Sequence, residues 1–404
     1  MYTFTFQVLQ ILIFLIPRKT KRRHYDKKQI VWTRKEYGKL IGLTLFGICL
    51  IILPANLFAQ QGNINSTETE NAAVYYSKAF DLLEYPKSEV IKTQLQEVVK
   101  NGWQKEYKGL EKILAENESC FDEFKKGLKL EECDFNFSKE YKYLIQKEIP
   151  NLLKVRNLSN LLLLKGRYYE KQKDFDEAVN IYLSSLRFAQ HISQDNTVSK
   201  MIAIAIEKEA YAPLKQYLDS EKVEKETRLR ILNYLTKYEK EHFSAKELVE
   251  VEKDFFISNI KMLADEAEQQ AEKDSKFNVE KKKTMEALGE EMISQAQELA
   301  NRYYGNFAKA IETNNEKDWE FAINELDSLQ KTLKSPISNI KDVSSLLYDA
   351  FTKDVEGSKI TIARKIVTIT LAISIPNFRR AAEHYYLTLK ELKEAESLAN
   401  INLR

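Results

Sequence analysis

The chain is poor in the residues that make turns, with 11 glycines and 7 prolines among its 404 residues. Average proteins hold about 7% Gly and about 5% Pro, so both are depleted two-fold or more. Sheet-rich folds place Gly and Pro in their turns, and collagen-like and disordered sequences are rich in them, so the composition argues against all three classes. With 44% apolar residues, the chain can bury a sizeable core. The composition predicts an all-α fold.

The residues of metal and redox chemistry are also few. Three cysteines are too few for a disulfide scaffold or a Cys-rich zinc site. The four histidines lie far apart in the chain, at His24, His191, His242 and His384. Glu239 and His242 have the E-x-x-H spacing of a di-iron bundle, but such a site needs a second copy, which the sequence lacks. Phosphate-binding loops and the G-x-S-x-G motif are missing too. We therefore predict no metal, no cofactor and no catalytic residue.

Most of the chain has no excess of positive charge. The 62 basic and 60 acidic residues give a net charge of +2. Residues 18–39 alone hold ten basic residues against Asp26 and Glu36, so residues 40–404 carry a net charge of −6. Nucleic-acid binding needs a basic face on the folded body. We therefore expect no nucleic-acid partner.

Two uncharged runs flank this basic segment. Residues 40–59 form a run long enough to cross a hydrocarbon core of about 30 Å, and residues 1–17 are a candidate first span. Because Lys and Arg collect on the cytoplasmic side, 18–39 is predicted to be a cytoplasmic loop. Residues 40–59 are then an anchor in the cytoplasmic (inner) membrane, with the body on the exported, periplasmic side. In the alternative, residues 18–59 are a long signal sequence cut after Ala59, although Leu57 is a poor cleavage signal.

The rest of the chain divides by composition. Residues 60–70 are a polar linker, and Thr67 with Glu70 has the capping-box pattern of a helix start. Residues 71–220 are predicted to form a repeat-like helical domain, 221–335 long amphipathic helices, and 336–404 C-terminal helices that pack on the body. Turn signals divide the first of these domains into helix-length pieces, at Pro86, Asn101-Gly102, Gly127, Pro150, Lys173-Asp174 and Pro213.

One segment, at about 158–191, has a repeat-like pattern. A small residue, an aromatic, an alanine and a second aromatic stand at Gly166, Tyr169, Ala178 and Tyr182. This spacing resembles a tetratricopeptide unit, in which the small residue lets two antiparallel helices approach and an aromatic fills their crossing. The resemblance implies a groove on the inner face of the first helix, which could hold a peptide carboxylate. Its residues would be Asn160, Leu163, Arg167 and Lys171.

Further units are much less regular. The segments 72–76 and 381–386 echo each other, with small residues one turn before a tyrosine pair. Because about three repeats are needed to bury their faces, the expected architecture is an irregular α-solenoid or helical-hairpin array behind the anchor. The body also resembles exported or membrane-anchored helical proteins of bacteria, a resemblance that implies no biochemical activity. It is carried by Asn71-Ala72-Ala73-Val74-Tyr75-Tyr76, Cys133-Asp134-Phe135, Phe175-Asp176-Glu177-Ala178 and Ile375-Pro376-Asn377-Phe378.

The second half of the chain carries clearer helix signals. Ser244 and Glu247 form a capping box, preceded by Phe243 as a hydrophobic staple. Apolar residues that step by three or four from Met285 to Ile311 predict one long amphipathic helix. The β-branched run at 366–375 is interpreted as a buried helix that stops at Pro376, with a strand or a further membrane span as alternatives.

Cys120 and Cys133 stand thirteen positions apart in the domain predicted to be exported. They could form a disulfide there, or remain buried thiols.

These observations favour a membrane-anchored scaffold that binds a peptide or another envelope protein without catalysis. One alternative is a cell-envelope hydrolase whose scattered carboxylates meet in the fold, since two suffice to cleave a glycan. Another is a sensor that acts through the basic loop, although such a loop also serves topology and anionic lipid contact.

Overall fold

The computed structural model describes residues 71–136, 140–144, 147, 151–194, 196–220, 223–273, 279–313, 315–334 and 359–401. The candidate first span, basic loop, membrane anchor and linker, at 1–70, lie outside these residues, as does Pro150. Among the helices in the described ranges, none is both long and apolar enough to cross a membrane.

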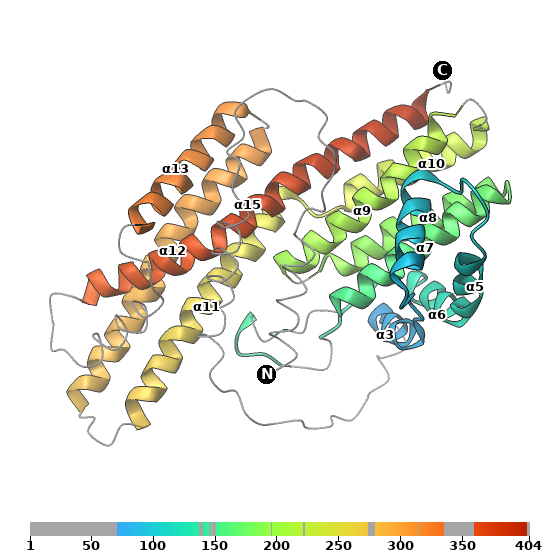
Figure 1. Cartoon of the computed structure of the whole chain (residues 1–404). Helices are drawn as coiled ribbons and strands as arrows, with labels where there is room; N and C mark the ends of the chain where they lie inside the picture. Colours follow the sequence, from blue (N-terminus) through green and yellow to red (C-terminus); the bar gives the residue numbers. More distant parts are fainter. Residues whose placement is uncertain are drawn as a thin grey trace. The chain divides into compact units, whose positions relative to one another are not determined.

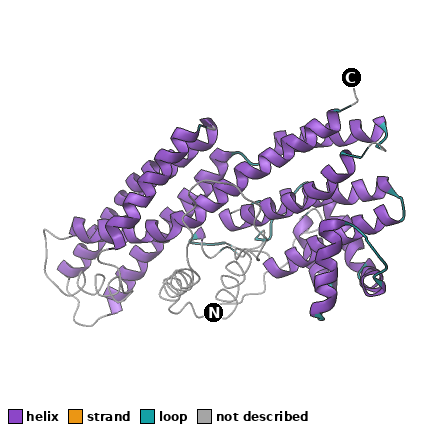
Figure 2. Cartoon of the chain, turned by 45° about the horizontal axis from the view of Figure 1, so that its top comes forward, coloured by secondary structure: helices purple, strands orange, loops and turns teal. Residues whose placement is uncertain are grey.

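The described residues form α-helices joined by loops, which confirms the predicted all-α class (Figures 1 and 2). The earlier helices are α3 (Ala72–Leu82), α4 (Glu89–Asn101), α5 (Lys108–Glu116), α6 (Glu118–Leu128), α7 (Leu152–Lys171), α8 (Phe175–Ile192) and α9 (Thr197–Leu218). The later ones are α10 (Lys225–Glu241), α11 (Ala245–Lys273), α12 (Val279–Thr313), α13 (Glu316–Lys334) and α15 (Lys359–Asn400). Within the described ranges, β-type pairing is limited to an isolated bridge between Asn71 and Glu132.

The chain forms two compact units that interleave in the sequence. The α3–α10 unit also includes α11 up to Glu252 and α15 from Phe378. The α12–α13 unit includes α11 from Lys253, α15 up to Asn377, and the segment 142–146. The division expected from composition at residue 220 falls inside the α3–α10 unit, because α10 packs against α8.

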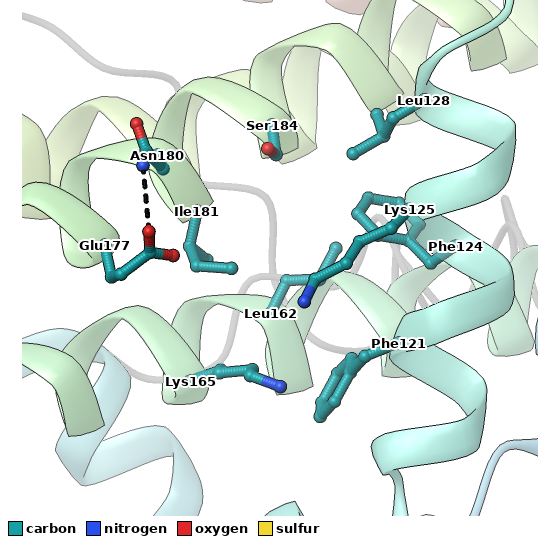
Figure 3. A pocket seen from close by; sticks show the side chains of 10 residues that line it. All are labelled: Phe121, Phe124, Lys125, Leu128, Leu162, Lys165, Glu177, Asn180, Ile181 and Ser184. Carbon is teal, nitrogen blue, oxygen red and sulfur yellow. Dashed lines mark hydrogen bonds between the residues drawn. The ribbon is translucent and has the colours of Figure 1, made fainter.

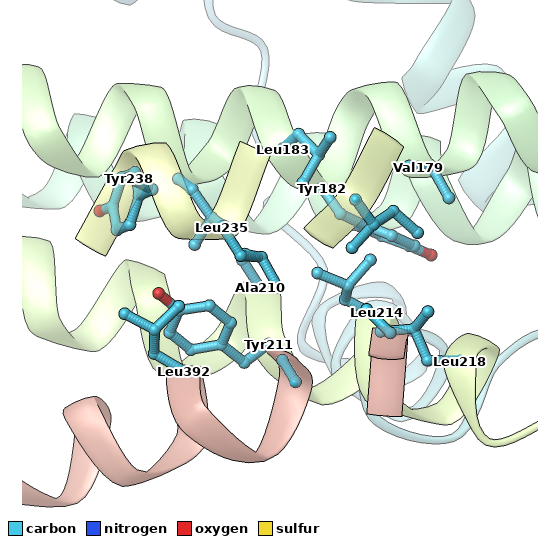
Figure 4. Close-up of a cluster of buried hydrophobic side chains, with 14 of the residues drawn as sticks. Val179, Tyr182, Leu183, Ala210, Tyr211, Leu214, Leu218, Leu235, Tyr238 and Leu392 are labelled. Carbon is cyan, nitrogen blue, oxygen red and sulfur yellow. The ribbon is translucent and has the colours of Figure 1, made fainter. Parts of the chain in front are cut away.

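Stacked helical hairpins build the α3–α10 unit. Helix α7 packs on α8, α8 packs on α9, α3 packs on α6, and α4 packs on α7. Side chains from α8, α9, α10 and α15 meet in one apolar cluster (Figure 4). Tyr182, Tyr211 and Leu235 are fully buried there, and Tyr238 and Leu392 are nearly so. Because whole aromatic rings are buried, this cluster is a major source of the unit's stability.

Local capping signals set several helix ends where the sequence predicts them. The Asp174 carboxylate accepts from the Glu177 N–H at 3.2 Å, which starts α8 directly after the predicted turn. Gly102 ends α4 in a positive-φ conformation, with φ at 76°, which glycine adopts without strain. Helix α3 begins at Ala72, and the side chain of Asn71 caps it. Thr67 and Glu70, the predicted capping box, lie outside the described residues.

Two predicted breaks at proline are wrong. Helix α9 runs through Pro213 to Leu218, and α15 runs through Pro376 to Asn400. A proline inside a helix costs about 3 kcal/mol. Burial on both sides of each proline offsets this cost. Around Pro376 the buried residues are Ile366, Val367 and Leu371 before it, and Phe378, Ala381 and Ala382 after it. The run 366–375 is helical and largely buried, which confirms its interpretation as a buried helix and rules out the strand alternative. The break predicted at Gly127 falls one residue before the end of α6 at Leu128.

The α12–α13 unit is held by a long amphipathic helix, as the apolar spacing predicts. Helix α12 spans Val279–Thr313. Of the apolar residues that step by three or four along it, those from Leu288 to Ile311 are buried, except Leu299, which is partly buried. It packs against α13, where Phe307 meets Trp319 with their ring centroids 6.2 Å apart. Arg302 donates to Glu325 across the same pair of helices. Helix α12 also contacts α11 and α15. The ring of Tyr304 on α12 packs against that of Phe256 on α11, and Arg364 of α15 donates to the Gln295 side chain of α12.

Candidate functional site

The four residues of the expected groove on α7 are covered by neighbouring helices. Leu163 is fully buried in the core cluster, and Asn160 is 7% exposed with its amide 3.4 Å from the Tyr85 hydroxyl. Arg167 is buried and donates to the Val99 carbonyl and to Glu170. No open groove therefore lies along this face, and the expected peptide site on it is wrong.

Lys171 is the fourth residue of that face, and it is already paired. Its ammonium donates to Glu106 at 2.9 Å and to Glu111 at 2.7 Å, and it lies 5.1 Å from the centre of the Trp103 ring. The segment between α4 and α5 supplies Trp103 and Glu106, so the chain itself occupies the positions where a ligand carboxylate was expected.

The packing positions of the repeat-like unit do come together. A Cβ placed on Gly166 would stand 2.4 Å from the Tyr182 ring, which shows how closely the two helices approach there. Tyr182 is fully buried and donates from its hydroxyl to Glu170 at 2.9 Å. Ala178 is buried one turn before Tyr182, and Tyr169 is half-buried beside the same cluster. The Gly–Tyr crossing of α7 and α8 is therefore a tightly packed joint.

Cys120 and Cys133 are two buried thiols that are not joined by a disulfide. Cys120 lies in α6, eight residues before the end of the helix, which is about 12 Å along its axis. The segment after α6 then runs to the start of α3, where the Glu132 carbonyl accepts from the Ala72 N–H. This path holds Cys133 at the start of α3. Burial raises the pKa of the Cys120 thiol to about 12, against a smaller opposing effect of Lys165, so it remains a protonated thiol at neutral pH.

A crevice of about 90 Å³ lies where α6 faces the α7–α8 hairpin (Figure 3). Its apolar lining comes from all three helices, namely Phe121, Phe124, Leu128, Leu162 and Ile181. Its polar lining consists of Lys125, Lys165, Glu177, Asn180 and Ser184. Liquid water takes about 30 Å³ per molecule, so the crevice has the volume of about three waters and suits one branched aliphatic side chain.

Lys165 gives this crevice its electrostatic character. The residue is 5% exposed, and its ammonium lies 4.1 Å from the centre of the Phe121 ring. It donates to the two carboxylate oxygens of Glu118 at 3.0 and 3.2 Å. Lys125, one turn after Phe121 on α6, is exposed and reaches the same space (Figure 3). On the α8 side, Asn180 donates to Glu177 at 3.3 Å. The crevice is thus cationic on one side and anionic on the other.

Sequence reasoning missed this crevice. Phe121, Phe124 and Leu128 stand at the spacing of one helix face, so an apolar stripe on α6 could be read from the sequence. The sequence does not show which helix this stripe faces, because α6 and α7 are separated by a long connection.

A second group of interest is the buried histidine of the E-x-x-H pattern. His242 faces Glu207 of α9, with its Nε2 atom 3.0 and 3.1 Å from the two carboxylate oxygens. Its Nδ1 atom lies 2.9 Å from the Phe243 carbonyl. The Phe243 carbonyl and an ionised Glu207 are both acceptors, so a ring that carries a proton on each nitrogen can donate to both. Tyr238 donates to the same carboxylate at 2.7 Å. Burial alone would lower the pKa of His242, but Glu207 more than offsets it and the pKa is raised.

This histidine is enclosed by the side chains around it. The Glu207 side chain is 1% exposed, and the His242 side chain is 4% exposed. Glu239 points elsewhere and accepts from Lys393. Within the described ranges, no group of three His, Cys, Asp or Glu residues could hold a metal ion.

An open pocket of about 510 Å³ lies in the α12–α13 unit. It contains two carboxylates, Asp254 and Asp265, which were the kind of pair expected of a hydrolase. Both belong to α11, eleven residues apart, which is about 16 Å along the helix. Glycan-cleaving pairs stand about 5–9.5 Å apart. Asp265 is also bonded to Lys142 and Tyr143, and although its partial burial raises its pKa, these two partners outweigh that and hold the pKa below its usual range.

Comparisons with protein-family models, with curated proteins and with solved structures gave no match to this chain. Its function is therefore argued from its own residues.

Proposed function

We propose that this protein is a membrane-anchored helical scaffold that binds peptide segments of other envelope proteins on the exported side, without catalysing a reaction. The observation that carries the proposal is the crevice between α6, α7 and α8, which presents an apolar floor beneath charged side chains. Interfaces obtain most of their binding energy where an apolar side chain fills such a pocket inside a polar rim.

The architecture supports the same proposal. Helices α7, α8 and α9 pack on one another in succession, and Gly166 lets α7 approach the Tyr182 ring of α8 closely. We take this close crossing as support for a tetratricopeptide-like unit. We extend the proposal to the fold, as an irregular helical-hairpin array behind an anchor at residues 40–59. The anchor and the exported orientation rest on the uncharged run and on the ten basic residues of 18–39.

The envelope-hydrolase alternative has less support. The separation of Asp254 and Asp265 along α11 is too large for paired acid–base chemistry on one glycosidic bond. The buried Glu207 is held by Tyr238 and His242 and does not line the described pockets.

Site-specific photo-cross-linking in native membranes tests this function. A photoreactive phenylalanine replaces Asn180, an exposed residue of the crevice lining, in the full-length protein. The control places the same group at Gln172, which is exposed in the α7–α8 turn. We expect irradiation to join one polypeptide to position 180 and none to position 172. Equal cross-linking from both positions, or none from position 180, would contradict a peptide site in the crevice.

The anchor is tested on the same membranes. We expect the full chain to stay in the pellet after alkaline extraction and a chain that begins at residue 60 to be released. A cysteine introduced at the exposed Gln172 should react with an impermeant thiol reagent added from the exported side. Release of the full chain by alkali would contradict the anchor, and labelling from the cytoplasmic side alone would contradict the orientation.

A further inference from the structure

We infer that the crevice selects peptide segments in which an acidic residue stands next to a branched aliphatic residue. The inference rests on the proposed function and names the chemistry of the partner. It follows from how the apolar and charged side chains of the crevice are arranged (Figure 3).

The apolar part of the crevice fixes the aliphatic residue. Leu162 and Ile181 form its lining on the α7–α8 side, and Phe121, Phe124 and Leu128 form it on the α6 side. The volume of about 90 Å³ accommodates a leucine, isoleucine or valine side chain.

The two lysines on the cationic side of the crevice determine the preference for an acidic residue. Lys125 forms no ion pair with any residue in the described ranges, and its ammonium points into the crevice (Figure 3). Lys165 has three N–H donors, and Glu118 is the one described residue that accepts from it. A carboxylate placed between these two ammonium groups gains charge-assisted hydrogen bonds from both. Because Lys165 is already desolvated and held over Phe121, little conformational entropy is lost when it binds.

The anionic side of the crevice, at Glu177, limits how many acidic residues the bound peptide can carry. Glu177 lies across the crevice from Lys125 and its carboxylate is exposed (Figure 3). It repels a second acidic residue on that side and accepts from backbone N–H groups of a bound peptide. Asn180 and Ser184 add one amide and one hydroxyl beside it. The site therefore favours one acidic residue beside the aliphatic anchor and disfavours a continuous acidic run.

Fluorescence polarisation with three end-capped peptides tests the inference on the full-length protein in detergent. The first peptide contains an adjacent glutamate and leucine among glycines and serines. Glutamine replaces the glutamate in the second, and alanine replaces the leucine in the third. We expect the Glu-Leu peptide to bind most tightly, with each replacement weakening binding about five- to tenfold. Its affinity should fall as salt is added, whereas that of the Gln-Leu peptide should not change.

Variants of the protein assign the effect to the crevice. Lys125→Gln should weaken binding of the Glu-Leu peptide about five- to tenfold and leave binding of the Gln-Leu peptide unchanged. Because Lys125 is exposed and holds no helix in place, the variant should keep its fold. The matched control is Lys126→Gln, because Lys126 pairs with Glu123 and is not part of the crevice lining. Ser184→Trp should abolish binding of all three peptides by filling the crevice.

The outcomes separate the two proposals. If the Glu-Leu and Gln-Leu peptides bind equally, or if Lys125→Gln has no larger effect than Lys126→Gln, the acidic preference is wrong although peptide binding stands. If no peptide binds, or if Ser184→Trp leaves binding intact, both the inference and the proposed peptide site in the crevice are wrong.

Discussion

The protonated form of His242 can donate one ring N–H to the Glu207 carboxylate and the other to the Phe243 carbonyl, so the folded structure favours that form. Its pKa is raised, because the attraction of Glu207 exceeds the opposing effect of burial. Lys200 of α9 lowers this pKa, while Glu247 of α11 adds a nearby negative charge. Tyr238 and Tyr385 are the other titratable side chains in contact with the ring. A neutral imidazole has one N–H, so deprotonation removes one of the two hydrogen bonds.

We expect the free energy of unfolding to fall as pH rises above about 6.5, because the folded state then holds a proton that the unfolded chain releases. The fall ends once the pH passes the raised pKa of folded His242. Urea unfolding at a series of pH values measures this slope. His242→Gln should remove it, whereas the control His384→Gln should keep it. A wild-type slope retained in His242→Gln would contradict this assignment.

Other buried groups titrate as well, which is why the variant comparison is needed. Burial raises the pKa of Glu252 to about 7, so stability also falls as pH rises from about 4.5 to 7. Burial raises the pKa of Glu209 in the same direction. Burial, aided by Arg187, lowers the pKa of His191 to about 3, so acidification below about 6.5 destabilises the fold through that residue. Only the part of the slope that His242→Gln removes is therefore assigned to His242.

Gly166 is a second residue whose identity the fold requires. We expect Gly166→Ala to destabilise the α3–α10 unit by about 1–3 kcal/mol, because its methyl group would overlap the buried Tyr182 ring. The control is Gly305→Ala on α12, where a Cβ meets no atom within 4 Å and a helix former is gained. Chemical denaturation compares the two. Equal stability of both variants would show that α7 and α8 can separate without cost.

At the scale of single elements, the start of α11 shows what sequence can predict. The Glu247 N–H donates to the Ser244 hydroxyl at 3.1 Å, and the Ser244 N–H donates back to the Glu247 carboxylate, which confirms the predicted capping box. Phe243 and Leu248 are both buried, at the two staple positions. Such a cap is predictable because all its partners lie within four residues of each other.

The cap leads to a direct prediction. Ser244→Ala should lower the free energy of unfolding by about 1 kcal/mol, since the Glu247 N–H at the start of α11 loses the hydroxyl that accepts from it. Ser294→Ala is the matched control, because Ser294 is exposed within α12 and its loss should change stability by less than about 0.5 kcal/mol. Thermal unfolding of both variants provides the comparison. A Ser244→Ala effect no larger than the control would mean that water replaces the cap at no cost.

Predictions at the same scale fail where distant segments decide the outcome. The local preference of Pro376 is to end a helix, but buried residues on both sides keep α15 continuous. The inner face of α7 has the composition of a polar groove, yet α4, α5 and α9 supply partners for Arg167 and Lys171. The crevice combines a stripe on α6 with positions on α7 and α8. Its existence depends on how these helices are paired, which no local pattern encodes.

At the scale of the whole molecule, the end of the chain completes the core of the α3–α10 unit. Leu392, Ala395 and Ala399 of α15 are buried in the cluster formed by α8, α9 and α10 (Figure 4). Buried Arg228 of α10 joins the ends of two helices, because it donates to the Leu398 carbonyl of α15 and to the Leu218 carbonyl of α9, each at 2.8 Å. Lys215 of α9 adds ion pairs to Glu391 and Glu394. Because α15 follows α8, α9 and α10 in the chain, the unit cannot close this core until residues 378–400 have been made.

This dependence predicts a long-range effect of one residue near the C-terminus. Leu392→Ala should lower the stability of the α3–α10 unit by about 2–5 kcal/mol, because it leaves a cavity among α9 and α10 side chains. Hydrogen exchange should then accelerate in α9 and α10 as well as in α15. Leu387→Ala is the control, because Leu387 lies on the same helix and is 45% exposed. If both variants exchange at the same rate in α9, the end of α15 only rests on a core that α8, α9 and α10 complete without it.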